Sequence, residues 1–135
     1  MKRILLFSLL CFFVKAHAVD WVKIGENKSK DSFYVDVENI KKNNGFVYYW
    51  NLINFLGQRK TGAHSYISKY KVDCVHEQQI WLSNTFYSQP KGNGKIITEY
   101  VPVWNHYGST LNEIRYLTSG SIEYKIMKFV CDRAR

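Results

Sequence analysis

The stretch HSYISKYKVDC, residues 64–74, decides the fold of this chain. Its side chains alternate in character as those of a β-strand do, because successive residues point to opposite faces of a sheet. One face carries Tyr66, Tyr70, Val72 and Cys74, and the other carries Lys69, Lys71 and Asp73. We therefore predict a strand over residues 63–75 whose Cys74 face is buried.

A secretory signal peptide is predicted at the start of the chain. Residues 1–18 combine Lys2 and Arg3, an uncharged apolar run and an A-x-A pattern at residues 16–18 that is typical of a cleavage site. The apolar run has about half the ~20 residues that a membrane span needs. We expect cleavage after Ala18, export to the periplasm or cell surface, and no transmembrane segment in the mature chain.

Cleavage leaves 117 residues, 19–135, which is the size of one domain with its own core. The full chain has a formal charge of +8, and loss of Lys2, Arg3 and Lys15 leaves +5. A moderately basic exported domain fits acidic partners, although the same charge also serves solubility alone. Composition leaves both interpretations open.

The mature chain retains two cysteines, Cys74 and Cys131. Thiols pair in an oxidising compartment, and two cysteines allow a single connectivity. We predict a disulfide between them. The sequence has no C-x-x-C motif, and neither cysteine has the context of a catalytic nucleophile or a metal ligand.

Six stretches rich in aromatic and β-branched residues predict strands, at residues 20–25, 33–37, 45–56, 63–75, 78–88 and 95–104. The connections between them are short, which suits hairpins and leaves little room for crossover helices. We expect an antiparallel meander. Residues 45–56 are apolar on both sides, which predicts a central strand that is covered on both faces over part of its length.

A C-terminal helix is predicted after Gly120. Ser121 can serve as its N-cap, and Glu123 in the first turn suits the helix dipole. A disulfide allows Cα atoms only about 4.4–6.8 Å apart, so this helix has to lie across the Cys74 face of the sheet. The capping box in STLNEIRYL, residues 109–117, favours a further short helix. The predicted fold class is α+β, with about six antiparallel strands and a helix packed on one face.

Several segments together carry a resemblance to a known family. They are Trp21-Val22, FYVDVENIKK (33–42), YYWNLINF (48–55), HSYISKYKVDC, WLSNTFYSQPKGNGKI (81–96) and SGSIEYKIMKFVC (119–131). The most specific is the pair Asp73-Cys74 together with Cys131 in a final helix. With these segments the chain resembles the surface-adhesin protein E family over nearly the whole mature chain. It departs from the family at Ser119, where a proline is usual, and the segment 105–118 looks like an insertion.

The resemblance implies an exported binding domain with a six-stranded antiparallel sheet and a helix held by a disulfide. It implies no catalytic residues. We also expect no cofactor and no metal site. The partner would be another protein, an extracellular matrix component or, as some members form dimers, a second copy of the chain. We expect no nucleic acid partner, because sheet packing accounts for most of the aromatic residues.

The alternative is a periplasmic domain with a structural or small hydrolytic, histidine-dependent function. Its acid and base would come from His64, His76 and His106, but no spacing rule brings the three together. His76 adjoins Glu77, and the two side chains would point apart in an extended segment, so they do not form a metal site.

The candidate interaction surface lies on the face opposite Cys74. Alternation assigns Lys69, Lys71, Trp81 and Tyr87 to this face. Rings with basic neighbours are common in protein interfaces, because Tyr and Trp bury a large area at little entropy cost. The competing interpretation is that the segment 105–118 and the N-terminal strand cover these rings.

Overall fold

The structure is a computed structural model, and it describes residues 19–100 and 114–134. The predicted signal peptide and its cleavage site lie outside the described residues. So do the end of the sixth predicted strand, His106 and most of the segment 105–118.

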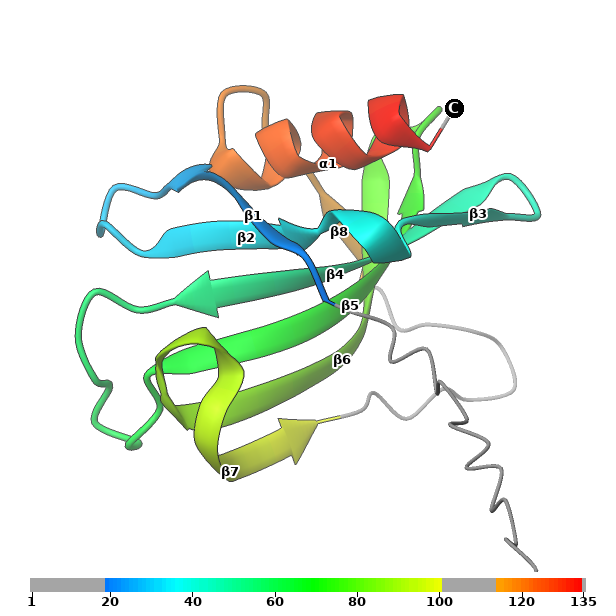
Figure 1. The fold of residues 1–135 in the computed structure, drawn as a ribbon. Helices are drawn as coiled ribbons and strands as arrows, with labels where there is room; N and C mark the ends of the chain where they lie inside the picture. Colours follow the sequence, from blue (N-terminus) through cyan, green and yellow to red (C-terminus); the bar gives the residue numbers. More distant parts are fainter. Residues whose placement is uncertain (1–18, 101–113, 135) are drawn as a thin grey trace, which may run out of the picture.

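The described residues form one antiparallel sheet and one α-helix (Figure 1). The elements are β1 (Trp21–Glu26), β2 (Ser32–Asp36), the 3₁₀ turn η1 (Val37–Asn39), β3 (Lys41–Asn43), β4 (Phe46–Asn54), β5 (Ser65–Asp73), β6 (Gln78–Gln89), the 3₁₀ turn η2 (Pro90–Gly92), β7 (Asn93–Tyr100), β8 (Ile114–Tyr116) and α1 (Ile122–Arg133). The main path of the sheet runs β1-β2-β4-β5-β6-β7. The predicted six-stranded meander is confirmed.

Two short strands, β3 and β8, add to the six predicted ones. β3 pairs with the start of β4, and the turn between them contains Asn44 and Gly45 at φ values of 50° and 81°. These left-handed conformations suit a tight hairpin turn, and Asn and Gly adopt them at least cost. The polar sequence of β3 does not have the character of a strand, which is why it was not predicted.

The prediction of a short helix in STLNEIRYL is wrong for residues 114–116. These residues form β8, which pairs antiparallel with residues 78–80 at the start of β6. The capping box is a local signal of about 1 kcal/mol. Pairing with the otherwise open edge of β6 provides backbone hydrogen bonds that the local signal does not outweigh.

The helix α1 lies on one face of the sheet and encloses the core with it (Figure 1). Buried side chains of this core come from β2, β4, β5 and the helix, and they are Phe33, Val35, Val47, Tyr49, Ile53, Val72, Ile126, Met127 and Val130. The predicted disulfide joins Cys74, just after β5, to Cys131 of α1 with Cα atoms 6.0 Å apart. Tyr66 and Tyr70 pack against the core, so the predicted buried face of residues 63–75 is confirmed.

The start of α1 follows the predicted cap. The Ser121 hydroxyl oxygen accepts a hydrogen bond from the Tyr124 backbone N–H at 3.1 Å. The same hydroxyl donates to the Thr118 carbonyl at 2.7 Å. One side chain thereby satisfies an open N–H of the first turn and fixes the direction from which the chain enters the helix.

The opposite face of the sheet is covered at one end by η2, which contacts β4, β5 and β6 and lies in front of β5 in Figure 1. The Lys91 backbone N–H donates to Asn54 Oδ1 at 2.6 Å. A Cβ on Gly92 would stand 2.8 Å from Ile67 Cδ1, so only glycine allows this close approach. Leu52, on the same face, is 0% exposed. The central strand β4 is therefore buried on both faces here, as predicted for part of its length.

Candidate binding surface

A β-bulge in β6 separates two of the residues predicted to share the interaction surface. Lys69 pairs with Ser83 and Tyr70 pairs with Trp81, which leaves Leu82 as the extra residue. Trp81 therefore lies on the helix side and lines a cavity there. Its predicted place beside the two lysines is wrong, because one extra residue reverses the alternation and leaves no mark in the sequence pattern.

The other three predicted residues share the face opposite α1. Tyr87 pairs with Ser65, which lies on the same side of β5 as Lys69 and Lys71. Tyr87 is close to η2, at the covered end of this face: a Cβ on Gly92 would stand 3.9 Å from its ring. The lysines lie at the end that η2 leaves uncovered, so the structure groups them with different rings from the predicted ones.

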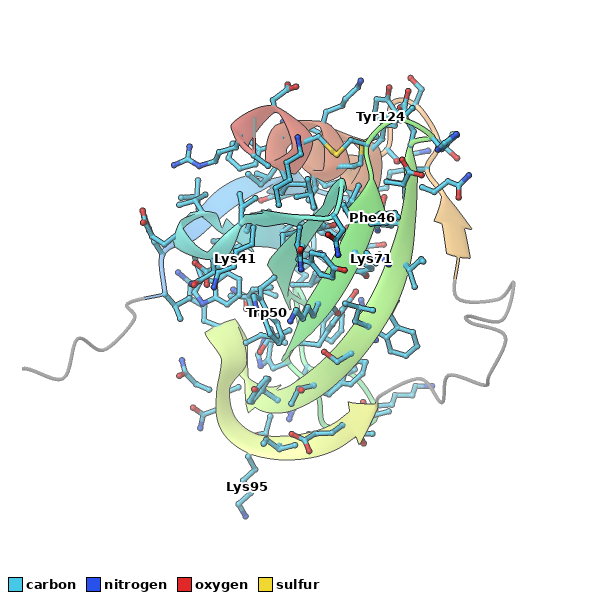
Figure 2. The ribbon with its side chains drawn as sticks, turned by 90° about the vertical axis from the view of Figure 1, so that its right-hand side faces the viewer. Lys41, Phe46, Trp50, Lys71, Lys95 and Tyr124 are labelled. Atoms are coloured by element: carbon cyan, nitrogen blue, oxygen red, sulfur yellow. A yellow bond between two sulfur atoms is a disulfide. The ribbon has the colours of Figure 1, made fainter. Side chains whose placement is uncertain are left out.

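These rings come from alternate residues of β4. Trp50 pairs with Lys69, and Tyr48 pairs with both Lys71 of β5 and Lys41 of β3. Residues paired across strands project from the same face. We call this set the lysine–aromatic patch, and its members are Lys41, Phe46, Tyr48, Trp50, Lys69 and Lys71. Figure 2 shows Lys41, Phe46, Trp50 and Lys71 together on the side that faces the viewer.

The lysines of β5 lie over the rings of β4. Lys71 Nζ is 4.1 Å from the centroid of Phe46, and Lys69 Nζ is 5.3 Å from the centroid of Trp50. Such cation–π contacts contribute about 0.5–1 kcal/mol each at exposed sites. All three rings of the patch are half-buried. The contacts therefore hold the ammonium groups in place while leaving part of each ring open to a partner.

No carboxylate neutralises these lysines within the described part of the chain. The ion pairs there are Lys23–Glu26, Arg59–Asp31 and His76–Asp73, none of which involves the patch. Asp73 projects from the same face, but its carboxylate is occupied by His76 at 2.7 Å. The patch is therefore a positively charged surface backed by aromatic rings.

The two histidines that the structure describes, His64 and His76, do not lie together. His64 and His76 flank opposite ends of β5, whose nine residues span about 30 Å. His76 pairs with Asp73 in a turn, and the His64 backbone N–H donates to the Tyr87 carbonyl. An acid–base pair made from these two residues is therefore ruled out by distance.

Two further observations concern the described residues alone. Across residues 19–100 and 114–134, no three His, Cys, Asp or Glu side chains gather as metal ligands do. The single α-helix of this part of the chain is neither long nor apolar enough to cross a bilayer.

The fold and the patch define a small disulfide-bonded α+β domain with a helix on one sheet face and a basic aromatic surface on the other. The chain belongs to the surface-adhesin protein E family, whose model matches residues 21–132. The resemblance seen in the sequence is thereby confirmed.

Solved structures of protein E from Haemophilus influenzae share this fold. One is 17% identical, with a TM-score of 0.58 over 88% of this chain and 92% of that one. A second crystal form is 18% identical, with a TM-score of 0.58 over 88% and 95%. Protein E from non-typeable Haemophilus influenzae is 18% identical, with a TM-score of 0.53 over 87% and 80%. At these identities the likeness concerns the fold. Among curated protein sequences, none matches this chain.

Proposed function

We propose that this chain is an exported, non-enzymatic surface adhesin. Its lysine–aromatic patch would bind an acidic segment of another protein or of an extracellular matrix component. The observation that carries the proposal is the combination of three unneutralised lysines with three half-buried rings on the face opposite α1. Membership of a surface-adhesin family supports adhesion as the activity.

The chemistry of the patch suits such a partner. Ammonium groups attract carboxylates or sulfates over several ångströms and steer the encounter. Phe46, Tyr48 and Trp50 then provide rigid apolar area at the centre of the contact, where binding energy concentrates in protein interfaces. The lysines select an acidic partner, and the rings retain it.

A second copy of the chain is a less suitable occupant of the patch. In a two-fold symmetric contact the same patch meets itself, so Lys69 and Lys71 would approach lysines of the partner copy. Like charges placed together oppose association. Sedimentation velocity at two ionic strengths tests this argument: a dimer through the patch would strengthen with salt, whereas binding to an acidic partner weakens.

Export is part of the proposal, with residues 1–18 removed and residues 19–135 forming the mature domain. Intact-mass measurement of the native protein should give the mass of a chain that begins at Val19. Protease added to intact cells should degrade the protein. Protection in intact cells, with degradation after permeabilisation, would place it in the periplasm and contradict adhesion.

Two variants of equal charge test the patch. The first, Trp50→Ala with Lys69→Gln and Lys71→Gln, removes its centre. The control, Lys28→Gln with Lys95→Gln, removes two charges from exposed residues elsewhere, and Figure 2 shows Lys95 far from the patch.

Each variant is titrated against immobilised basement-membrane extract and against heparin. We expect the patch variant to lose roughly tenfold or more in affinity and the control to keep wild-type affinity. An equal loss of affinity in both variants would show that binding depends only on the net charge of the protein. Unchanged affinity in both variants would show that the patch is not the binding surface.

A further inference from the structure

A row of polar side chains crosses the middle of the sheet face that α1 covers. Asn51 of β4 pairs with Ser68 of β5, which pairs with Asn84 of β6. Asn51 is 4% exposed and Ser68 is 0% exposed. The rows on either side are apolar or aromatic, namely Tyr49–Tyr70–Trp81 and Ile53–Tyr66–Phe86. Polar groups in such a position are costly unless each one is hydrogen-bonded.

One member of this polar row lacks a partner. The Ser68 hydroxyl donates to Asn84 Oδ1. Asn51 Oδ1 is buried and accepts no hydrogen bond from any described residue. A buried acceptor without a donor opposes folding, whereas an apolar residue of similar shape would carry no such penalty. The position of Asn51 therefore indicates a donor that comes from outside the chain.

Asn51 lines a cavity that can admit such a donor. The cavity lies between the sheet and α1 and measures about 230 Å³. It is smaller than the roughly 300–1,000 Å³ of pockets for drug-sized ligands, and much larger than the ~30 Å³ that one water occupies. Its size suits a ligand of a single ring. Glu123, exposed on the first turn of α1, also lines it and gives it contact with solvent.

The other residues that line the cavity indicate the chemistry of this single-ring ligand. Tyr66, Tyr70 and Trp81 present aromatic surfaces, while Asn84 and Gln79 contribute amides. The described lining includes no Lys or Arg, so an anionic ligand would find no counter-charge. The open acceptors, Asn51 Oδ1 and the Glu123 carboxylate, call for a ligand that donates hydrogen bonds.

We propose that this cavity binds one neutral sugar unit. A sugar ring carries hydroxyl donors around its rim, which match the acceptors of Asn51 and Glu123. Its faces carry C–H groups, which pack against aromatic rings through apolar and weak hydrogen-bonding contacts. This site is distinct from the lysine–aromatic patch, which lies on the other face of the sheet.

Titration of the wild-type protein tests the proposal directly. The probes are glucose, galactose and N-acetylglucosamine, with glucuronate and glucosamine as charged analogues of the same ring size. Binding is followed through tryptophan fluorescence and through the NMR signals of the Asn side-chain amides. We expect saturable binding of at least one neutral sugar, with a dissociation constant on the order of 1 mM and shifts at Asn51 and Asn84. Failure of all three neutral sugars to saturate at about 100 mM, or binding of a charged analogue alone, would overturn it.

Substitutions then locate the binding. Asn51→Leu removes the unpartnered acceptor at similar volume, so sugar affinity should fall roughly tenfold or more while the unfolding midpoint stays the same or rises. The matched control is Asn43→Leu, at an exposed residue of β3, which should bind as wild type does. Glu123→Leu, on the exposed side of the helix, gives a second variant if Asn51→Leu does not fold, and its affinity should fall roughly threefold.

The test of sugar binding is independent of the test of adhesion. Asn51→Leu leaves the lysine–aromatic patch intact, so binding to matrix extract should persist when sugar binding is lost. Sugar affinity that is unchanged in both Asn51→Leu and Glu123→Leu would overturn the site, and loss of matrix binding in the patch variant would still support the adhesin.

Discussion

Asp73 holds the imidazole of His76 across the turn that contains Cys74 of the disulfide: His76 Nδ1 lies 2.7 Å from Asp73 Oδ2. The other carboxylate oxygen accepts hydrogen bonds from the backbone N–H groups of Val75 and His76, each at 3.1 Å. The hydrogen bond from His76 is the main cause that lowers the pKa of Asp73 below its ordinary value, and these backbone hydrogen bonds add to it. Since the next residue is Cys74, this turn fixes the strand end to which α1 is tied.

Acid should weaken the fold through this carboxylate. A group whose pKa is lowered by folding stabilises the protein above its unfolded pKa, about 3.9 for Asp, and the contribution is lost as the pH falls through the folded pKa. Asp73→Asn should therefore cost about 0.5–1 kcal/mol at pH 7 and show a smaller loss of stability than wild type below about pH 4. Urea unfolding between about pH 2 and pH 7 measures both. If Asp73→Asn loses as much stability at low pH as wild type does, the Asp73 carboxylate is not the group responsible. In an NMR titration, His76→Ala should raise the pKa of Asp73.

The disulfide should be the largest single contribution to stability outside the fully buried core side chains, against which Cys74 and Cys131 pack. Cys74 and Cys131 are 57 residues apart in sequence, and closure of a loop of this length stabilises a protein by roughly 4 kcal/mol at most. We expect Cys74→Ala with Cys131→Ala to lose about 2–4 kcal/mol in urea unfolding. Reduction of the wild-type protein should give a similar loss. A loss under about 1 kcal/mol would mean that core packing alone holds α1 in place.

The helix cap offers a smaller and more local test. Ser121→Ala removes the acceptor for the Tyr124 N–H, which should cost about 1 kcal/mol. Ser119→Ala, at an exposed residue two positions earlier, serves as its matched control and should stay within about 0.5 kcal/mol of wild type. Equal effects in the two variants would show that the cap does not stabilise the helix.

The cover that η2 provides can be tested at Gly92. Its φ is 73°, and a methyl group there would press against Ile67, so Gly92→Ala should destabilise the protein by more than about 1 kcal/mol. Gly57→Ala is the control, because a methyl group at Gly57 would meet nothing within 4 Å. The difference between their thermal midpoints reports how firmly η2 rests on Ile67. Equal midpoints would show that η2 moves aside freely.

Alternation in the sequence was sufficient to predict the sheet and the buried face of β5, because it extends over whole strands. The disulfide followed from the two cysteines left after export, and the sheet face that α1 covers followed from the disulfide. Trp81 was misplaced because the bulge at Leu82 is a single-residue event, and both alternations around it look regular. β3 and β8 were missed because three residues carry too little pattern and depend on an available edge of β4 or β6.

The binding features were less accessible from the sequence than the fold. Lys69 and Lys71 were found by alternation, but their contacts with Trp50 and Phe46 depend on the register between β4 and β5. That register emerges only when both faces of the sheet are packed. A signal for the cavity was present in the sequence: Asn51 interrupts the run of aromatic and aliphatic residues 46–53, and a buried amide in such a run indicates a specific polar function.

The disulfide between Cys74 and Cys131 also affects how the protein can be produced in the laboratory. All six main strands are synthesised before α1. The side chains of Tyr66 and Tyr70 therefore stay exposed to solvent until α1 has been synthesised, has packed on the sheet and has formed the disulfide. Exposed rings on an unfinished sheet favour aggregation. Synthesis in a reducing cytoplasm should therefore yield mainly insoluble material, and secretion into an oxidising compartment with a disulfide isomerase should recover soluble protein.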